Sequence, residues 1–149
     1  MIIKNLKNIY FISVPPEKPK IYTVGGKPDG NEIRLKLGPY NLGDTVKLRC
    51  VSLGGRPLPK VTWWRDHALL DASDRRLGSF KTENELVLKD LKREDLHSIL
   101  TCQATNNNFS VPVSTSVKLD MNCKYFGTRV GPRTCSYFLC FVRFEVRCF

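Results

Sequence analysis

The chain has 149 residues, enough for one ordinary domain and too few for two comfortable ones. Hydrophobic residues make up 42% and charged residues 26%, close to globular averages, which excludes a collagen-like, low-complexity or wholly disordered chain. The 24 Lys and Arg residues against 14 Asp and Glu residues give a formal net charge of +10. This charge permits nucleic acid, heparin-like glycan or acidic lipid as a partner, but it does not choose among them.

The charge divides the chain into three segments. Residues 1–14 carry +2, residues 15–120 carry 17 basic and 13 acidic groups for +4, and residues 121–149 carry +4. Most of the excess therefore lies at the two ends. We expect an irregular N-terminal segment at 1–14, one domain at 15–120 and a Cys-rich, irregular tail at 121–149.

The N-terminal segment has two lysines and then a short apolar run from Ile9 to Val14. A secretory signal needs about 7–15 apolar residues and a small-residue cleavage site, whereas this run meets Pro15 and Pro16. We therefore assign no signal peptide. No window reaches the roughly 18–20 uninterrupted apolar residues of a membrane helix, so no membrane anchor is predicted within the chain as given.

The apolar residues between Pro15 and Asp120 recur with a period of two, which is typical of half-buried strands. This alternation is seen at Val46, Leu48 and Cys50, at Val61 and Trp63, at Leu86 and Leu88, at Leu100 and Cys102, and at Val111, Val113, Val117 and Leu119. Turn residues separate the runs at Pro28-Asp29-Gly30, Gly38-Pro39, Gly43-Asp44, Gly54-Gly55 and Asn106 to Asn108. Residues 90–97 are the one segment that suggests a helical turn. The pattern predicts an all-β, antiparallel sandwich or barrel.

Two cysteines and a tryptophan have a specific spacing. Cys50 and Cys102 are separated by 51 residues, and Trp63 follows Cys50 after 12 residues. In an immunoglobulin sandwich the first Cys lies on strand B, the Trp on strand C and the second Cys on strand F, so that a disulfide joins the two sheets and the indole packs against it. The alternative is a pair of ordinary buried thiols in a cytosolic protein.

The adjacent Trp63 and Trp64 must point to opposite faces of one strand, because side chains alternate. Trp63 shares its phase with the other apolar residues of the strand and is the expected core residue. Trp64 should point outward, where it is either a contact residue for a partner or covered by a neighbouring strand. We also expect Arg65 and Gln103 to point outward and to belong to the same partner-binding surface, since exposed aromatic and Arg residues often anchor interfaces.

Several stretches together resemble immunoglobulin-superfamily adhesion receptors: GDTVKLRC at 43–50, GGRPLPKVTWWRD at 54–66, LVLKDLKREDL at 86–96, LTCQATNNNFSVPVS at 100–114 and VKLDMN at 117–122. The likeness covers residues 15–122 and is closest to the CD80-like C2 domains of arthropod sidestep-type neuronal receptors. It implies an extracellular Ig-like domain, part of a single-pass membrane receptor for adhesion and axon guidance. The implied partners are other Ig-superfamily surface proteins, including the beaten-path group.

One position departs from the general immunoglobulin pattern. The residue two before the second Cys is usually a Tyr whose hydroxyl holds the corner between strands E and F, and here it is Leu100. A buried Leu replaces the ring as core packing but not the hydroxyl. We therefore expect other contacts to hold this corner.

Catalytic and nucleic-acid functions find little support in the sequence. The two histidines, His67 and His97, lie in no motif for nucleophilic or metal-assisted catalysis, so we predict no enzyme activity, no cofactor and no small-molecule substrate. No nucleic-acid-binding motif is visible, and a disulfide would imply the wrong compartment for nucleic acid. The alternative function is that of a basic secreted or intracellular protein that binds a polyanion, either heparan-type glycan or nucleic acid.

The sequence offers one glycosylation site and an unusual tail. Asn108-Phe109-Ser110 is the only N-x-S/T sequon, and its place in the expected F–G loop would allow glycosylation in a secreted chain. The tail holds Cys123, Cys135, Cys140 and Cys148, without a C-x-x-C pair or a nearby His. A small metal or disulfide knot is one interpretation. We favour an irregular end without function, such as translated non-coding sequence.

Overall fold

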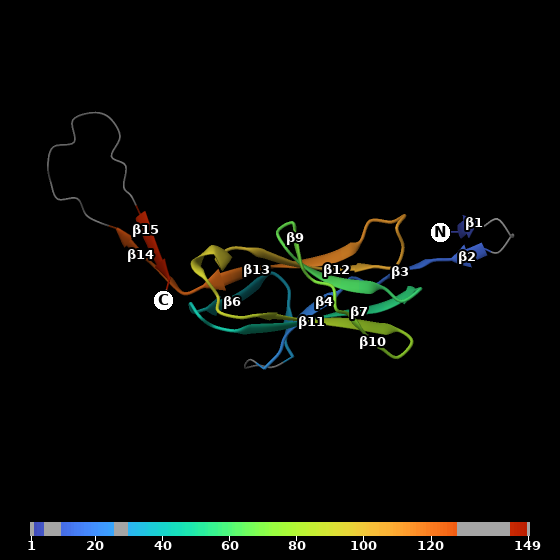
Figure 1. The fold of residues 1–149 in the computed structure, drawn as a ribbon, viewed down its shortest axis with the longest axis horizontal. Helices are drawn as coiled ribbons and strands as arrows, with labels where there is room; N and C mark the ends of the chain where they lie inside the picture. Colours follow the sequence, from blue (N-terminus) through green and yellow to red (C-terminus); the bar gives the residue numbers. More distant parts are fainter. Residues whose placement is uncertain (1, 5–9, 26–29, 128–143, 149) are drawn as a thin grey trace, which may run out of the picture.

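The computed structural model describes the backbone of residues 2–4, 10–25, 30–127 and 144–148, and the side chains of residues 13–25 and 30–122. Its body is a sandwich of two β-sheets, seen from the side in Figure 1. The predicted all-β two-sheet architecture is therefore confirmed. The suggested helical turn at 90–97 is confirmed as a short 3-10 helix, η1 (Arg93–Asp95).

One layer is a six-stranded sheet. Its strands run in the order β10 (Arg75–Leu77), β11 (Lys81–Leu88), β7 (Val46–Arg56), β4 (Lys20–Thr23) and β5 (Glu32–Ile33), and β3 (Val14–Pro16) pairs with the end of β7. All of these pairings are antiparallel. The long β7 is the central strand, and it corresponds to the predicted strand B that carries Cys50.

The other layer is a five-stranded sheet. Its strands run in the order β6 (Lys36–Tyr40), β13 (Val113–Met121), β12 (Ile99–Thr105), β8 (Lys60–Arg65) and β9 (Ala68–Asp71). β6 runs parallel to β13, and the other pairs are antiparallel. The strands β8, β12 and β13 correspond to the predicted strands C, F and G.

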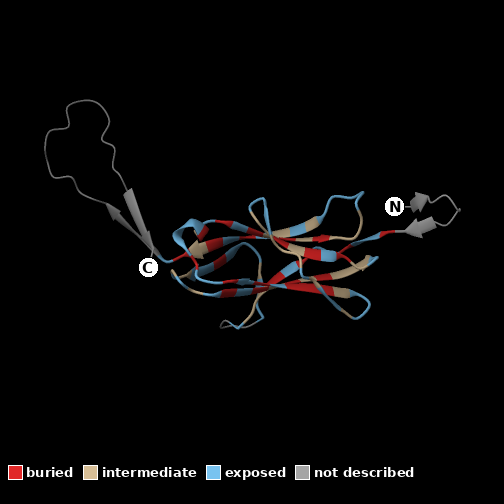
Figure 2. Ribbon diagram, viewed as in Figure 1, coloured by how far each residue is buried: buried red, intermediate tan, exposed pale blue. Residues whose placement is uncertain are grey.

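The core lies between the two layers, where Figure 2 shows the buried positions of both sheets facing each other. The Cys50–Cys102 disulfide joins β7 to β12 across this space, with the Cα atoms 6.4 Å apart. Trp63 lies opposite Cys102 in the register of β8 and β12 and is 0% exposed. Its indole Nε1 donates a hydrogen bond to the backbone carbonyl of Asn84 on β11, 3.2 Å away. The predicted bridge and core tryptophan are both confirmed.

Three local expectations differ from the structure. Val111 belongs to no strand and is 88% exposed, because β13 begins only at Val113, after Pro112. The expected turn at Gly54-Gly55 is instead the end of β7, where both glycines have a positive φ, a conformation that other residues rarely adopt. Gly38-Pro39 lies within β6, and Pro28 and Asp29 lie outside the described residues.

The ends of the chain also contain short paired strands where we expected irregular backbone. β1 (Ile2–Lys4) pairs with β2 (Tyr10–Ile12), and β14 (Cys123–Gly127) pairs with β15 (Phe144–Cys148). The packed sandwich extends slightly beyond 15–120, since Ser13 and Met121 are buried and the backbone N–H of Asn122 donates to the Tyr40 carbonyl. Cys135 and Cys140 of the tail lie outside the described residues.

We expect the two tryptophans to differ sharply in their contribution to stability. Trp63→Ala removes a fully buried indole and should lower the free energy of unfolding by about 3–5 kcal/mol, since the core cannot fill so large a space. Trp64→Ala, on the half-buried outer face of the same strand, should cost much less. Chemical denaturation of both variants checks this contrast, and equal losses would contradict the assignment of the faces.

Candidate interaction surface

The outer face of the five-stranded sheet carries a continuous group of uncharged side chains. Register places Trp64 of β8 opposite Thr101 of β12 and Leu69 of β9, and it places Gln103 opposite Thr62 and Ser114. All of these positions alternate with core residues, so their side chains share the outer face. We call this surface the uncharged face; it consists of Thr62, Trp64, Leu69, Thr101, Gln103, Ser114 and Ser116.

Hydrogen bonds within the uncharged face hold its side chains in place. The indole Nε1 of Trp64 donates to Thr62 Oγ1 over 2.9 Å, and the hydroxyls of Thr101 and Ser116 lie 2.8 Å apart. Trp64 is half-buried, so it is neither fully open to solvent nor covered by β9, while Leu69 beside it is 52% exposed. Four of its side chains, those of Trp64, Thr62, Thr101 and Ser116, are therefore held by hydrogen bonds within the face.

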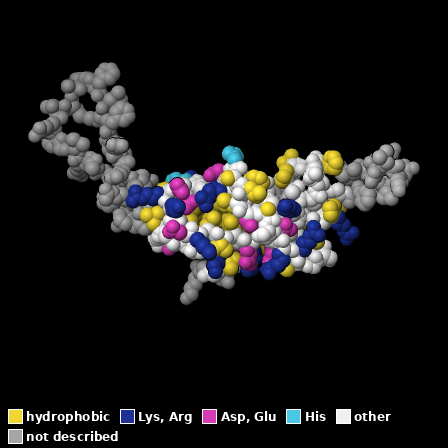
Figure 3. Space-filling model, viewed as in Figure 1, with side chains coloured by type: hydrophobic (Ala, Val, Ile, Leu, Met, Phe, Trp, Pro, Cys, Tyr) yellow, Lys and Arg dark blue, Asp and Glu magenta, His cyan; other side chains and the backbone are white. Residues whose placement is uncertain are grey.

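The outer face of the six-stranded sheet is different, because it is rich in charges that pair with one another. Arg49 Nε lies 3.0 Å from Glu85 Oε1, and Arg75 and Lys81 both pair with the buried Glu83. In Figure 3, Lys, Arg, Asp and Glu side chains gather along this lower layer, over β7, β10 and β11. Lys60 borders the uncharged face at one end. At the other end and the outer edge lie Lys118 and Lys36, and Lys36 pairs with Asp120 over 2.8 Å.

The expected direction of Arg65 is wrong. A period of two places Arg65 in phase with Trp63, and the register pairs it with the core residue Leu100. Its guanidinium Nη1 lies 2.6 Å from the buried carboxylate of Asp95. Arg65 is therefore an internal ion-pair residue at the end of β8 and no part of the uncharged face, whereas Trp64 and Gln103 lie where we expected them.

The loop between β12 and β13 carries the sequon. Asn108 is exposed, and Phe109 beside it is 67% exposed. The neighbouring Asn106 and Asn107 hold the loop: Asn106 Nδ2 donates to the carbonyls of Val14 and Pro57, and Asn107 Oδ1 accepts from the backbone N–H groups of residues 109 and 110. The fold thus places Asn108 on an ordered, accessible loop.

Among the described residues, no group of three or more His, Cys, Asp and Glu side chains comes together that could hold a metal ion. The described part of the chain likewise contains no helix that is both long and apolar enough to span a bilayer.

Comparison with known proteins identifies the family. A family model described as "Immunoglobulin domain" matches residues 31–106, about half of the chain and including both bridged cysteines and Trp63. The chain belongs to the immunoglobulin domain family.

Two solved structures share this immunoglobulin fold. The structure of Rst D1-D2 aligns with a TM-score of 0.54 and 24% identity, over 74% of this chain and 51% of that one. The full ectodomain of mouse nectin-like molecule 4 aligns with a TM-score of 0.56 and 18% identity, over 83% of this chain and 43% of that one. At such identities the likeness shows the fold alone. The chain spans about half the length of each solved chain.

A curated relative is similar in sequence. The titin homolog of Caenorhabditis elegans is 33% identical over 84 residues, which is 54% of this chain and 0% of that much longer protein. The match covers one domain's length, so it supports the family and not a role for the whole protein.

As an immunoglobulin domain, the chain lacks the usual tyrosine at the E–F corner, and Asp95 supplies the missing contacts. The Asp95 carboxylate accepts a hydrogen bond from the backbone N–H of Lys92 over 2.7 Å and pairs with Arg65. Its backbone carbonyl accepts from the Ser98 hydroxyl over 2.7 Å. Leu100 fills the core beneath and is 0% exposed. The sequence shows that the hydroxyl is missing, but not which of the adjacent acids, Glu94 or Asp95, turns inward.

We expect Asp95→Asn to lower the free energy of unfolding by about 1–3 kcal/mol, because it leaves the partly buried Arg65 guanidinium without its counter-charge. Glu94→Gln makes the same charge change on the neighbouring exposed residue and should cost less than about 0.5 kcal/mol. Denaturant unfolding of both variants is the measurement. Similar small effects at the two positions would show that Asp95 does not hold the corner.

The Glu83 cluster predicts a pH dependence. Burial by itself raises the pKa of the Glu83 carboxyl, but the hydrogen bond from Arg75 and the charge of Lys81 outweigh it and hold this pKa below its usual value. The carboxylate therefore stabilises the fold above the pKa of unfolded Glu, about 4.3, and this contribution is lost as the pH falls through the lower folded-state pKa.

We accordingly expect Glu83→Gln to be less stable than the natural chain at neutral pH and the difference to shrink in acid, as measured by urea unfolding across the acidic range. Glu85→Gln is the matched control, because its carboxylate pairs with Arg49 at a side chain that is 47% exposed. A loss of stability in Glu83→Gln that is the same at every pH would contradict the ion-pair account.

Proposed function

We propose that this chain is an extracellular recognition domain of a cell-surface adhesion receptor, which binds another immunoglobulin-superfamily protein through the uncharged face. The observation that carries the proposal is the contrast between the two sheets. One outer face carries three cations that pair with carboxylates, and the other has an aromatic ring and hydroxyl groups without a central charge.

This composition suits a protein interface. The buried centre of an interface is depleted in charged residues and enriched in aromatic ones, because an unpaired charge is costly to remove from water. On the uncharged face, Trp64 is held by Thr62, so little side-chain freedom is lost when a partner binds. The mixture of exposed Leu69 and small hydroxyl side chains permits close approach of a second flat sheet.

An extracellular location is supported by the Cys50–Cys102 bridge, since disulfides persist in oxidising compartments and are rare in the cytosol. The resemblance to sidestep-type receptors extends the proposal to axon guidance, with a beaten-path-like protein as the partner. We also propose that Asn108 carries a glycan in this setting. A glycan there would lie at the loop end of the sheet, which leaves the middle of the uncharged face open.

A second function is favoured by one observation, the 33% identity to a domain-sized part of a very long protein, the titin homolog. In that case the chain would be a spacer in a tandem array, and the uncharged face would need no partner. The binding experiment separates the two functions.

We expect the domain, displayed on a cell or bead surface, to bind at least one member of a panel of immunoglobulin-superfamily ectodomains, and Trp64→Ala to weaken that binding roughly thirtyfold, the effect of an interface hot spot. Ser116→Arg, which adds a charge to the uncharged face, should weaken it as well. Val87→Arg adds the same charge at a 44% exposed position on the opposite sheet and should bind normally.

Binding that none of these variants alters would contradict the assignment of the uncharged face. No binding across the panel would favour the spacer function. Thermal melts of each variant show whether a loss of binding reflects a loss of folding, which is a concern mainly for the half-buried Trp64.

A further inference from the structure

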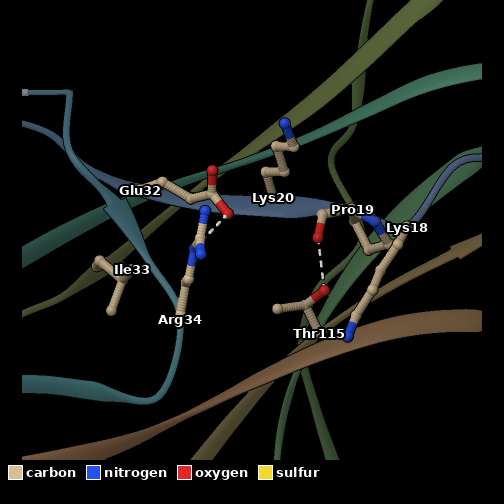
Figure 4. A pocket seen from close by; sticks show the side chains of 7 residues that line it. All are labelled: Lys18, Pro19, Lys20, Glu32, Ile33, Arg34 and Thr115. Atoms are coloured by element: carbon tan, nitrogen blue, oxygen red, sulfur yellow. Dashed lines mark hydrogen bonds and ion pairs between the residues drawn. The ribbon is translucent and has the colours of Figure 1, made fainter.

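A cleft of about 280 Å³ lies at the open edge of the sandwich, apart from the uncharged face. It is formed where the segment leading into β4 and the strand β5 approach β13 of the other sheet, shown from close by in Figure 4. Three basic residues, Lys18, Lys20 and Arg34, line it together with Glu32 and Thr115. The cleft therefore joins residues that lie almost one hundred positions apart in the chain.

The charges of the cleft are only partly neutralised. Arg34 Nε lies 3.3 Å from Glu32 Oε1, and the Arg34 side chain remains 81% exposed. Lys18 and Lys20 are both exposed, and neither forms an ion pair with any described residue. The lining therefore carries three positive charges against one negative charge. Elsewhere on the same six-stranded sheet, on β7, β10 and β11, the cations of Arg49, Arg75 and Lys81 have carboxylate partners.

The backbone beneath these cations is fixed. The Thr115 hydroxyl on β13 donates a hydrogen bond to the carbonyl of Pro19, which is the residue between the two lysines. Pro19 itself is buried. Because Pro19 is anchored, the backbone positions of Lys18 and Lys20 on either side of it are fixed. Only the two lysine side chains therefore need to become ordered when an anion binds.

We propose that this cleft binds sulfate groups of an acidic glycan chain. A guanidinium offers paired donors to a sulfate, and ammonium groups add compact positive charge, which is the chemistry that recognises sulfated sugars. A small open cleft lined by three cations suits one or two sugar units of an extended chain. The choice of glycan over nucleic acid rests on the extracellular location in the proposed function. The cleft and the uncharged face use no common residue, so both can act at once.

The test measures the affinity of the full chain for heparin by surface plasmon resonance at near-physiological salt. We expect the triple variant Lys18→Gln, Lys20→Gln, Arg34→Gln to bind roughly tenfold more weakly, the sum of three modest exposed charge interactions. The matched control Lys89→Gln, Lys92→Gln, Arg93→Gln removes three exposed positive charges near η1 and should bind almost as well as the natural chain. Both triple variants carry the same formal charge, three units below +10.

Equal weakening in the two triple variants would overturn the proposal, because binding would then depend on net charge alone. Heparin binding that neither variant weakens would also overturn it. Hyaluronan, a polyanion without sulfate, should bind the natural chain much more weakly than heparin, and equal binding of the two would overturn the sulfate specificity. Trp64→Ala should bind heparin normally. The heparin experiment therefore tests only the cleft, and the panel of ectodomains tests only the uncharged face, so either proposal can fail without the other.

Discussion

The cross-link between the two sheets is the constraint on which the rest of the structure depends. Cys50 of β7 and Cys102 of β12 must both point into the core to form their bridge, and Trp63 packs opposite Cys102 in the same layer. Since side chains alternate along a strand, these three residues determine the direction of every neighbouring position. Trp64, Thr101 and Gln103 are on the outer face for this reason.

Charge is distributed unequally over the outer faces of the two sheets. On the outer face of the six-stranded sheet, Arg49, Arg75 and Lys81 pair with Glu85 and Glu83, which is typical of a solvated surface. The five-stranded sheet has no charge at its centre, where a partner would have to remove water. The formal charge of +10 is therefore a poor guide to function, whereas the cleft beside β4 combines a local excess of positive charge with a concave shape.

The regular strands could be predicted from the sequence, since a period of two and the spacing of Cys50, Trp63 and Cys102 are local signals. Prediction failed where the outcome depends on contacts between distant segments. The period of two already places Arg65 in phase with Trp63, but its partner Asp95 lies thirty residues later in the chain. The choice of Asp95 over the adjacent Glu94 is made by the corner geometry. The cleft could not be predicted either, because it exists only once Pro19 and Thr115 are brought together.

The measurement that tests the account most directly is the mapping of disulfides in the protein isolated from its natural source, with free thiols blocked before proteolysis. The account predicts one peptide pair joined through Cys50 and Cys102, because the sandwich is cross-linked and the proposed function places it outside the reducing cytosol. Folded protein in which both cysteines carry the blocking group would contradict the extracellular recognition function. It would favour instead an intracellular domain within a long array.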